Sequence, residues 1–205
     1  MVLLPSPNNP TGTALPLETV SRVCAAAAAY EPAGVVVIDE AYGEFRRAGT
    51  PSALERLAQT PTLVVSRTMS KAFALAGGRL GYLAARTEIC DALRVVRLPY
   101  HLSAVTQAVA VTALQHADEL LARVDDLRVE RDRTVEWLRS LGLTVADSDA
   151  NFCLFGTFED RHAVFEGLLE RGVLIRETGP EGWLRVSIGT PEEMAAFRAA
   201  LLEVI

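Results

Sequence analysis

Lysine is nearly absent from this chain of 205 residues: of its 20 cationic side chains only Lys71 is a lysine, and the other 19 are arginines. Acidic side chains number 26, so the net charge is −6. Binding of nucleic acid by charge needs basic residues clustered on one face, and no segment clusters them. No apolar run approaches the roughly 20 residues that a membrane span needs. We therefore expect neither nucleic acid nor a membrane among the partners.

Cysteine is scarce as well. Cys24, Cys90 and Cys153 are odd in number and far apart, which argues against a disulfide framework. Residues 1–5 lack the basic start of a signal peptide. The histidines lie singly, without the spacing of metal ligands, so we expect no metal site. These features together favour a protein of the reducing cytoplasm.

The single lysine is the first candidate for chemistry. Arginine stays protonated in proteins, whereas a lysine amine can lose its proton and act as a nucleophile or a base. A chain that uses arginine everywhere else therefore makes Lys71 a candidate for a reaction that needs a free primary amine. Drift in composition would produce the same pattern, so the neighbouring residues have to decide between the two explanations.

The first half of the chain contains short β-branched runs separated by turn and helix signals. The runs are continuous rather than alternating, which is typical of strands covered on both faces in a mostly parallel α/β sheet. Pro16 and an alanine-rich segment predict a crossover helix over residues 17–30. The expected strands are residues 2–4, 35–38, 63–66 and 80–84.

The second half of the chain begins with a long helical pattern. Residues 104–141 predict one long helix or two in succession, which Gly142 ends. The strand and helix signals that follow are those of a small α+β domain. They predict a strand over residues 151–155, a helix over 161–171, strands over 173–176 and 183–188, and a helix from 191.

We therefore expect an α/β fold in three parts. Residues 1–103 form a partial large domain with a mostly parallel sheet, residues 104–142 form the long connecting helix or helices, and residues 143–205 form a small α+β C-terminal domain.

Polar residues follow the first three expected strands, where ligands bind in parallel α/β sheets. Asn9 comes after the first strand, Asp39 and Tyr42 after the second, and Ser70 and Lys71 after the third. An amide, a carboxylate, a phenol and an amine are therefore expected at one edge of the sheet. An Asp-Glu pair after a strand is also found in ATPases, but the glycine-rich phosphate loop that such a site needs is absent.

Pyridoxal phosphate chemistry uses this combination of groups, because a lysine amine binds the aldehyde carbon and a carboxylate keeps the ring nitrogen protonated. The motifs that contain these residues resemble the fold-type I pyridoxal-phosphate-dependent aminotransferases, and within them the histidinol-phosphate aminotransferases. The resemblance covers essentially the whole chain. It rests on Ser-Pro-Asn-Asn-Pro-Thr-Gly at residues 6–12, Ile-Asp-Glu-Ala-Tyr at 38–42 and Arg-Thr-Met-Ser-Lys at 67–71 with its continuation to 82, and on the similar segments 97–103, 172–177 and 184–190.

The resemblance implies a role for each residue around the cofactor ring. Lys71 is then the Schiff-base lysine that forms the internal aldimine, and later the acid and base that moves the α-proton. Asp39 pairs with the pyridine nitrogen. Tyr42 and Asn9 contact the ring oxygen.

It also implies the groups that hold anions. Ser70 and Arg79 bind the cofactor phosphate. Arg185 binds the anionic group of the substrate, and Arg176 assists with the substrate phosphate. A planar guanidinium suits a carboxylate and a phosphate alike.

The substrates that the resemblance implies are small amino donors and acceptors: glutamate with 2-oxoglutarate, and histidinol phosphate with imidazole acetol phosphate. It further implies a homodimer. The chain is shorter than those of the family, so we expect the N-terminal part of the large domain to be absent, the sheet edge to be exposed, and turnover to need a separate N-terminal half. Two alternatives stay open: an aromatic amino-acid aminotransferase of the same subfamily, and a non-catalytic remnant.

Overall fold

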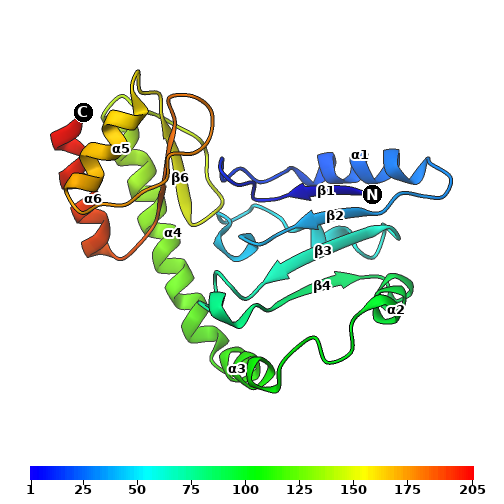
Figure 1. The fold of residues 1–205 in the computed structure, drawn as a ribbon. Helices are drawn as coiled ribbons and strands as arrows, with labels where there is room; N and C mark the ends of the chain where they lie inside the picture. The colour runs from blue at the N-terminus through cyan, green and yellow to red at the C-terminus, as the bar shows by residue number, and fades with distance from the viewer.

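The computed structural model describes residues 1–205 and contains two β-sheets joined by consecutive helices. Figure 1 shows the first sheet in the blue-to-green half of the chain and the second, yellow to orange, beyond the ends of its strands. None of the helices combines the length and the apolar character that a membrane crossing requires.

The first sheet has the strand order β1-β2-β3-β4. Strands β1 (Val2–Pro5), β2 (Val36–Asp39) and β3 (Leu63–Thr68) are parallel to one another, and β4 (Gly81–Ala85) is antiparallel to β3. The expected mostly parallel sheet is confirmed, and each strand lies within two residues of its predicted range.

Helix α1 (Leu17–Ala28) covers one face of this sheet. Its Val20 packs in a buried cluster that includes Ile38 of β2. We expected both faces of the sheet to be covered. This is wrong for the two outer strands, since Leu3 of β1 is 62% exposed and Leu83 of β4 is 40% exposed. These strands are apolar on both faces, but the helices of this chain leave part of the second face open to water.

Two helices in succession connect the sheets. Helix α3 (Ala104–Gln115) ends at His116, and α4 (Ala117–Ser140) begins directly after it. Gly142, with a φ of 82°, follows the end of α4 as predicted. Helix α2 (Thr87–Val96) was not predicted. Three short 3₁₀ helices complete this half: η1 (Gly43–Phe45), η2 (Ala53–Arg56) and η3 (Ala76–Gly78).

The second sheet is antiparallel, with the order β5-β6-β7. The strand expected over residues 173–176 is wrong, because that segment makes only one bridge to the sheet, between Arg176 and Arg185. Residues of α4, which precedes this sheet in the chain, and of the two later helices pack with the sheet in one buried core. The elements are β5 (Thr144–Val145), β6 (Phe152–Gly156), α5 (Arg161–Glu170), β7 (Leu184–Ser187) and α6 (Pro191–Val204).

A buried carboxylate anchors the segment that follows β2. Glu40 is 1% exposed and pairs with Arg46 at 2.9 Å and with Arg67 at 2.7 Å. It also accepts hydrogen bonds from the Ala53 backbone N–H at 2.7 Å and from the Ser52 hydroxyl. Every lone pair of this carboxylate is therefore used within the fold, and Glu40 stabilises the loop rather than facing a ligand.

We expect Glu40→Gln to lower the free energy of unfolding by about 3 kcal/mol at pH 7, because Arg46 loses its carboxylate partner and Arg67 keeps only Glu44. Burial acts to raise the pKa of Glu40, but its hydrogen bonds and the charges of Arg46 and Arg67 outweigh burial and lower that pKa. The stabilisation is therefore complete above about pH 4.3 and is lost as the pH falls through the lowered pKa. Urea unfolding at pH 7 and pH 3 checks this: the difference in unfolding free energy between wild type and variant should be smaller at pH 3, and a difference that stays constant would contradict the assignment. Asp91→Asn, in an exposed pair with Arg94, is the control.

Candidate active site

The loops that follow β1, β2 and β3 meet at the sheet edge that faces α4 and the second sheet (Figure 1). The strand register places Asp39, the last residue of β2, between Pro5 of β1 and Ser66 of β3. The Ser66 hydroxyl donates a hydrogen bond to Asp39 Oδ1 at 3.0 Å. The carboxylate is thus fixed at a strand end, and its Oδ2 receives no donor from the chain.

Lys71 and Tyr42 lie together at this edge, as predicted. The Lys71 Nζ atom is 5.5 Å from the centroid of the Tyr42 ring. The Tyr42 ring packs edge-on against Phe152 of β6, with 5.1 Å between the centroids. Arg185 of β7 lies over the Phe152 ring, with its Cζ 4.7 Å from the ring centroid. A continuous series of contacts therefore runs from the lysine amine to an arginine of the second sheet.

Arg185 also reaches the loop that follows β1. Its Nη1 donates a hydrogen bond to Asn9 Oδ1 at 2.5 Å. Arg176 lies directly opposite, where the two arginines exchange backbone hydrogen bonds of 2.9 and 2.8 Å. Residues paired in this way project their side chains to the same face. The structure therefore brings Asn9, Arg176 and Arg185 together. The sequence predicted a shared role for the two arginines but not the contact of Asn9 with Arg185.

The guanidinium of Arg185 is short of partners. Its Nε is buried and has no hydrogen-bond acceptor. Burial lowers the pKa of Arg185, the Tyr42 phenol acts in the opposite direction, and the charge of Arg176 lowers the pKa further. A buried donor without an acceptor, beside a second cation, is stabilised by an incoming anion. The arrangement therefore suits a carboxylate or a phosphate.

Ser70 and Arg79 are connected to each other only indirectly. The Thr68 hydroxyl lies 3.0 Å from the Ser70 hydroxyl and donates to the Leu80 carbonyl at 3.3 Å. This bond holds the segment that precedes Lys71 against the residue that follows Arg79. The Arg79 guanidinium itself donates to the Ala76 carbonyl at 3.0 Å and makes no hydrogen bond or ion pair with another predicted site residue.

Three residues of this site were not found from the sequence. Ser66 holds Asp39, Thr68 joins the segments around Ser70 and Leu80, and Phe152 separates Tyr42 from Arg185. The position of Ser66 opposite Asp39 in neighbouring strands was a usable signal once the register was known. Nothing in the sequence marked Phe152 as a site residue, since an aromatic residue in an apolar strand is expected to belong to the core.

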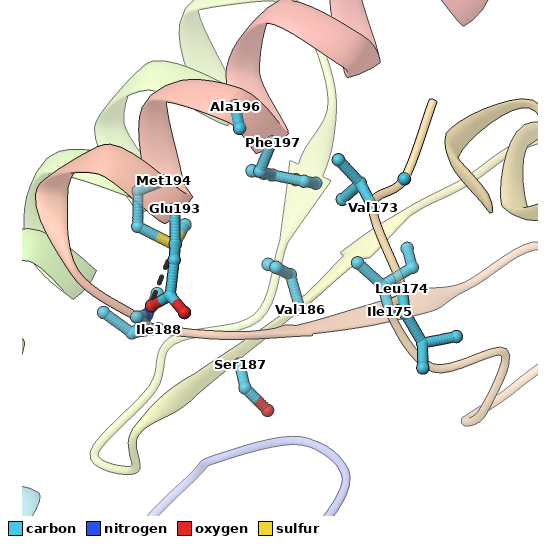
Figure 2. Close-up of a pocket in the computed structure, with 12 residues that line it drawn as sticks. Val173, Leu174, Ile175, Val186, Ser187, Ile188, Glu193, Met194, Ala196 and Phe197 are labelled. Atoms are coloured by element: carbon cyan, nitrogen blue, oxygen red, sulfur yellow. Dashed lines mark hydrogen bonds between the residues drawn. The ribbon is translucent and has the colours of Figure 1, made fainter. Parts of the chain in front are cut away.

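A separate pocket of about 420 Å³ lies in the second sheet region, between β7, α6 and residues 172–175. Figure 2 shows Val186 of β7, and Ile188 just after that strand, beside Met194 and Phe197 of α6. The Glu193 carboxylate at its edge already accepts the backbone N–H of Thr190 at 2.7 Å. The pocket contains none of the predicted site residues. Elsewhere in the fold, no three His, Cys, Asp or Glu side chains are grouped to hold a metal ion.

A family model for aminotransferase class I and II matches residues 1–201. The chain therefore belongs to the class I and II aminotransferase family. It is 68% identical over 202 residues to a histidinol-phosphate aminotransferase of Thermobifida fusca, covering 98% of this chain and 54% of that protein. It is 62% identical over 205 residues to histidinol-phosphate aminotransferase 3 of Burkholderia lata, covering 100% of this chain and 54% of that protein. The chain thus spans about half the length of the curated relatives it matches.

Solved structures agree with the family. A histidinol-phosphate aminotransferase of Sinorhizobium meliloti, in complex with pyridoxal-5'-phosphate, superposes with a TM-score of 0.83 at 31% identity, covering 99% of this chain and 56% of that one. A histidinol-phosphate aminotransferase of Clostridium acetobutylicum superposes with a TM-score of 0.87 at 25% identity, covering 99% and 63%. The expected α/β fold of this family is confirmed.

Proposed function

We propose that this chain provides the cofactor lysine and the substrate arginines of a histidinol-phosphate aminotransferase. The reaction moves an amino group between glutamate or 2-oxoglutarate and histidinol phosphate or imidazole acetol phosphate. The observation that carries the proposal is the pair Arg176 and Arg185, which have no carboxylate partner. Arg185 packs on Phe152, and Phe152 packs on the Tyr42 ring beside Lys71. The names of the relatives at 68% and 62% identity support the same reaction.

The residues at the sheet edge fit pyridoxal phosphate by their chemistry. When bound, this cofactor supplies a carbon that reacts with amines and a ring that withdraws electrons. We assign Lys71 to bind that carbon and Asp39, with its open Oδ2, to keep the ring nitrogen protonated. Asn9 and Tyr42 are assigned to the ring oxygen. The phosphate is assigned to Ser70 and Arg79.

Lys71 has a second role in this proposal, as the group that moves the proton at the substrate α-carbon. A primary amine can act as a base and then as an acid in such a transfer, whereas an arginine stays protonated. The Tyr42 ring, 5.5 Å from Nζ, keeps the amine beside the loop that follows β2. The scarcity of lysine elsewhere means that no other side chain of this chain can take over the reaction.

Arg185 and Arg176 divide the substrate anions between them. Arg185 is half-buried and lies next to the Asn9 amide, so we assign it to the anionic group of either substrate. Arg176 is exposed and lies opposite, so we assign it to the phosphate of histidinol phosphate. Two guanidinium groups on one face can bind a phosphate more strongly than one can.

This division predicts a change of specificity. Arg176→Gln should raise KM for histidinol phosphate about tenfold and KM for phenylalanine less than about twofold, because only the first donor carries a phosphate. The assay compares both donors with 2-oxoglutarate as acceptor. Arg171→Gln, which removes an exposed arginine paired with Glu203, is the control. Equal losses for the two donors would contradict the assignment of Arg176. A wild-type preference for phenylalanine would favour an aromatic amino-acid aminotransferase, and no transfer from either donor would favour a non-catalytic remnant.

We propose that the chain acts together with a second polypeptide surface. Residues 95–100, from the end of α2 into the segment before α3, expose apolar side chains: Val95 is 85% exposed, Val96 75%, Leu98 74% and Tyr100 100%. So much exposed apolar surface is typical of an interface. A homodimer, or a separate chain with the remaining half of the large domain, would cover it. The three parts proposed for the chain remain residues 1–103, 104–142 and 143–205, in a reducing, cytoplasmic compartment that the three free cysteines favour.

The assay is therefore run in two forms: with the chain alone, and with the chain mixed with the part of the Thermobifida fusca relative that lies outside the match. We expect the mixture to transfer amino groups from histidinol phosphate faster than the chain alone. Equal rates would contradict the need for a second polypeptide.

A further inference from the structure

A buried carboxylate outside the residues assigned above joins the two sheets. Asp149, in the segment between β5 and β6, is 2% exposed. Its Oδ1 accepts hydrogen bonds from the Arg47 backbone N–H at 2.9 Å and from the Thr50 hydroxyl at 3.0 Å, and its Oδ2 accepts from Arg47 Nη2 at 3.2 Å. Arg47 and Thr50 belong to the first sheet's half of the chain. Asp149 is therefore the central acceptor of this junction.

The same segment holds the loop that follows β1. The Asp149 backbone N–H donates to the Gly12 carbonyl at 2.8 Å. The Thr13 hydroxyl donates to the Asp147 carbonyl at 3.2 Å. Gly12 has a φ of +79°, and a Cβ atom there would lie 2.3 Å from Ser148 Oγ. The loop and the segment are thus in direct backbone contact, without space for a side chain between them.

Two residues that position Arg185, Asn9 and Phe152, lie on the two segments joined by this contact. Asn9, which accepts the hydrogen bond from Arg185, lies in the loop held by Asp149. Phe152, whose ring lies against Arg185, follows Asp149 in the chain at the start of β6. A small displacement of the 147–150 segment therefore moves both the acceptor and the aromatic surface that position Arg185.

We propose that Asp149 is a positioning residue: through Arg47, Thr50 and the Gly12 carbonyl it holds the Asn9 loop against the second sheet and so sets Arg185 for the substrate anion. This inference rests on the proposed function and deepens it, because it names a residue on which anion affinity depends without touching the substrate.

The charge of Asp149 is needed for this role. Burial acts to raise the pKa of Asp149, but the hydrogen bonds from the Arg47 side chain and backbone and from Thr50 outweigh burial and lower that pKa. The carboxylate is therefore ionised at neutral pH. An asparagine has nearly the same shape but lacks the charge and replaces one acceptor with a donor. Asp149→Asn consequently weakens the side-chain bonds to Arg47 and Thr50 with little change in volume, while the backbone bond to the Gly12 carbonyl remains.

Two measurements on the 205-residue chain test the proposal. The first is calorimetric titration with glutarate, a dicarboxylate that cannot be transaminated. The second is hydrogen exchange of residues 8–13, followed by mass spectrometry. We expect Asp149→Asn to raise the Kd for glutarate about tenfold and to speed exchange in residues 8–13, because a site loses affinity when its support is loosened. Thr50→Val, which removes a single hydrogen bond, should produce a smaller change in the same direction.

The control is Asp147→Asn, in the same segment. The Asp147 side chain pairs with Arg139 at the surface, at 2.7 Å, and is 60% exposed. Asp147→Asn should leave both the Kd for glutarate and the hydrogen exchange of residues 8–13 unchanged. If Asp149→Asn fails to fold, the result from Thr50→Val decides.

Two results would overturn the proposal: an unchanged glutarate Kd in folded Asp149→Asn or Thr50→Val, and a wild-type chain that does not bind glutarate. A variant that unfolds at lower temperature but binds glutarate normally while folded would show a purely structural role. These outcomes are distinct from failure of the proposed function, which is measured separately by the attachment of cofactor to Lys71.

Discussion

Replacing Lys71 with alanine should reduce amino-group transfer about 10⁴-fold, to the level of the uncatalysed background. The chain has no second lysine, so no neighbouring amine can bind the cofactor carbon or move the α-proton. The measurement is a single-turnover assay with histidinol phosphate, in the mixture that gives the highest wild-type rate. Asp39, Tyr42 and Arg185 are unchanged in this variant, so binding of the substrate anion should survive the loss of turnover.

Lys71→Arg separates charge from proton transfer at this position. Arginine retains the cation beside the Tyr42 ring but stays protonated. We expect this variant to be as inactive as the alanine variant. Activity within tenfold of wild type in Lys71→Arg would mean that only a positive charge is needed there, and would contradict the assigned chemistry.

The second large effect is expected at Arg185. Arg185→Gln should weaken glutarate binding about 100-fold, which corresponds to about 2.7 kcal/mol, within the range for two hydrogen bonds from a charged donor to a carboxylate. Part of the loss comes from the Asn9 loop, which Arg185 also holds. Calorimetric titration with glutarate measures the total effect.

Asn9→Ala measures the contribution of that loop contact. It removes the acceptor of the 2.5 Å hydrogen bond but leaves the guanidinium in place. We expect a loss of affinity of less than about tenfold. A loss as large as that of Arg185→Gln would mean that the guanidinium matters chiefly as a partner of Asn9, and would contradict its assignment to the substrate anion.

The residues at the sheet edge could be predicted because their positions follow from a simple rule. Continuous apolar runs indicated parallel strands, and the carboxyl ends of parallel strands lie at one edge. Asp39 and Lys71 follow such runs directly, so their neighbourhood was fixed by local sequence. The two arginines of the second sheet were predicted from the resemblance of their motifs alone.

Contacts between the two sheets could not be predicted in the same way. Phe152 and Asp149 act across the junction, where each meets a partner about a hundred positions away in the chain. Their sequence contexts, an apolar strand and an Asp-Ser-Asp turn, are ordinary for a core residue and a surface loop. The segment 173–176 was expected to be a strand because its residues are β-branched and apolar, but it pairs with β7 only at Arg176. In that case the tertiary contacts overrode the local propensity.

We expect Lys71 to bind pyridoxal phosphate at this sheet edge. The most direct test is to incubate the purified chain with pyridoxal phosphate, alone and with the remaining part of the Thermobifida fusca relative, record the visible absorption spectrum, reduce with borohydride, and map the labelled peptide. We expect label on Lys71 and none in Lys71→Ala. A folded chain whose Lys71 stays unlabelled in both mixtures would contradict it.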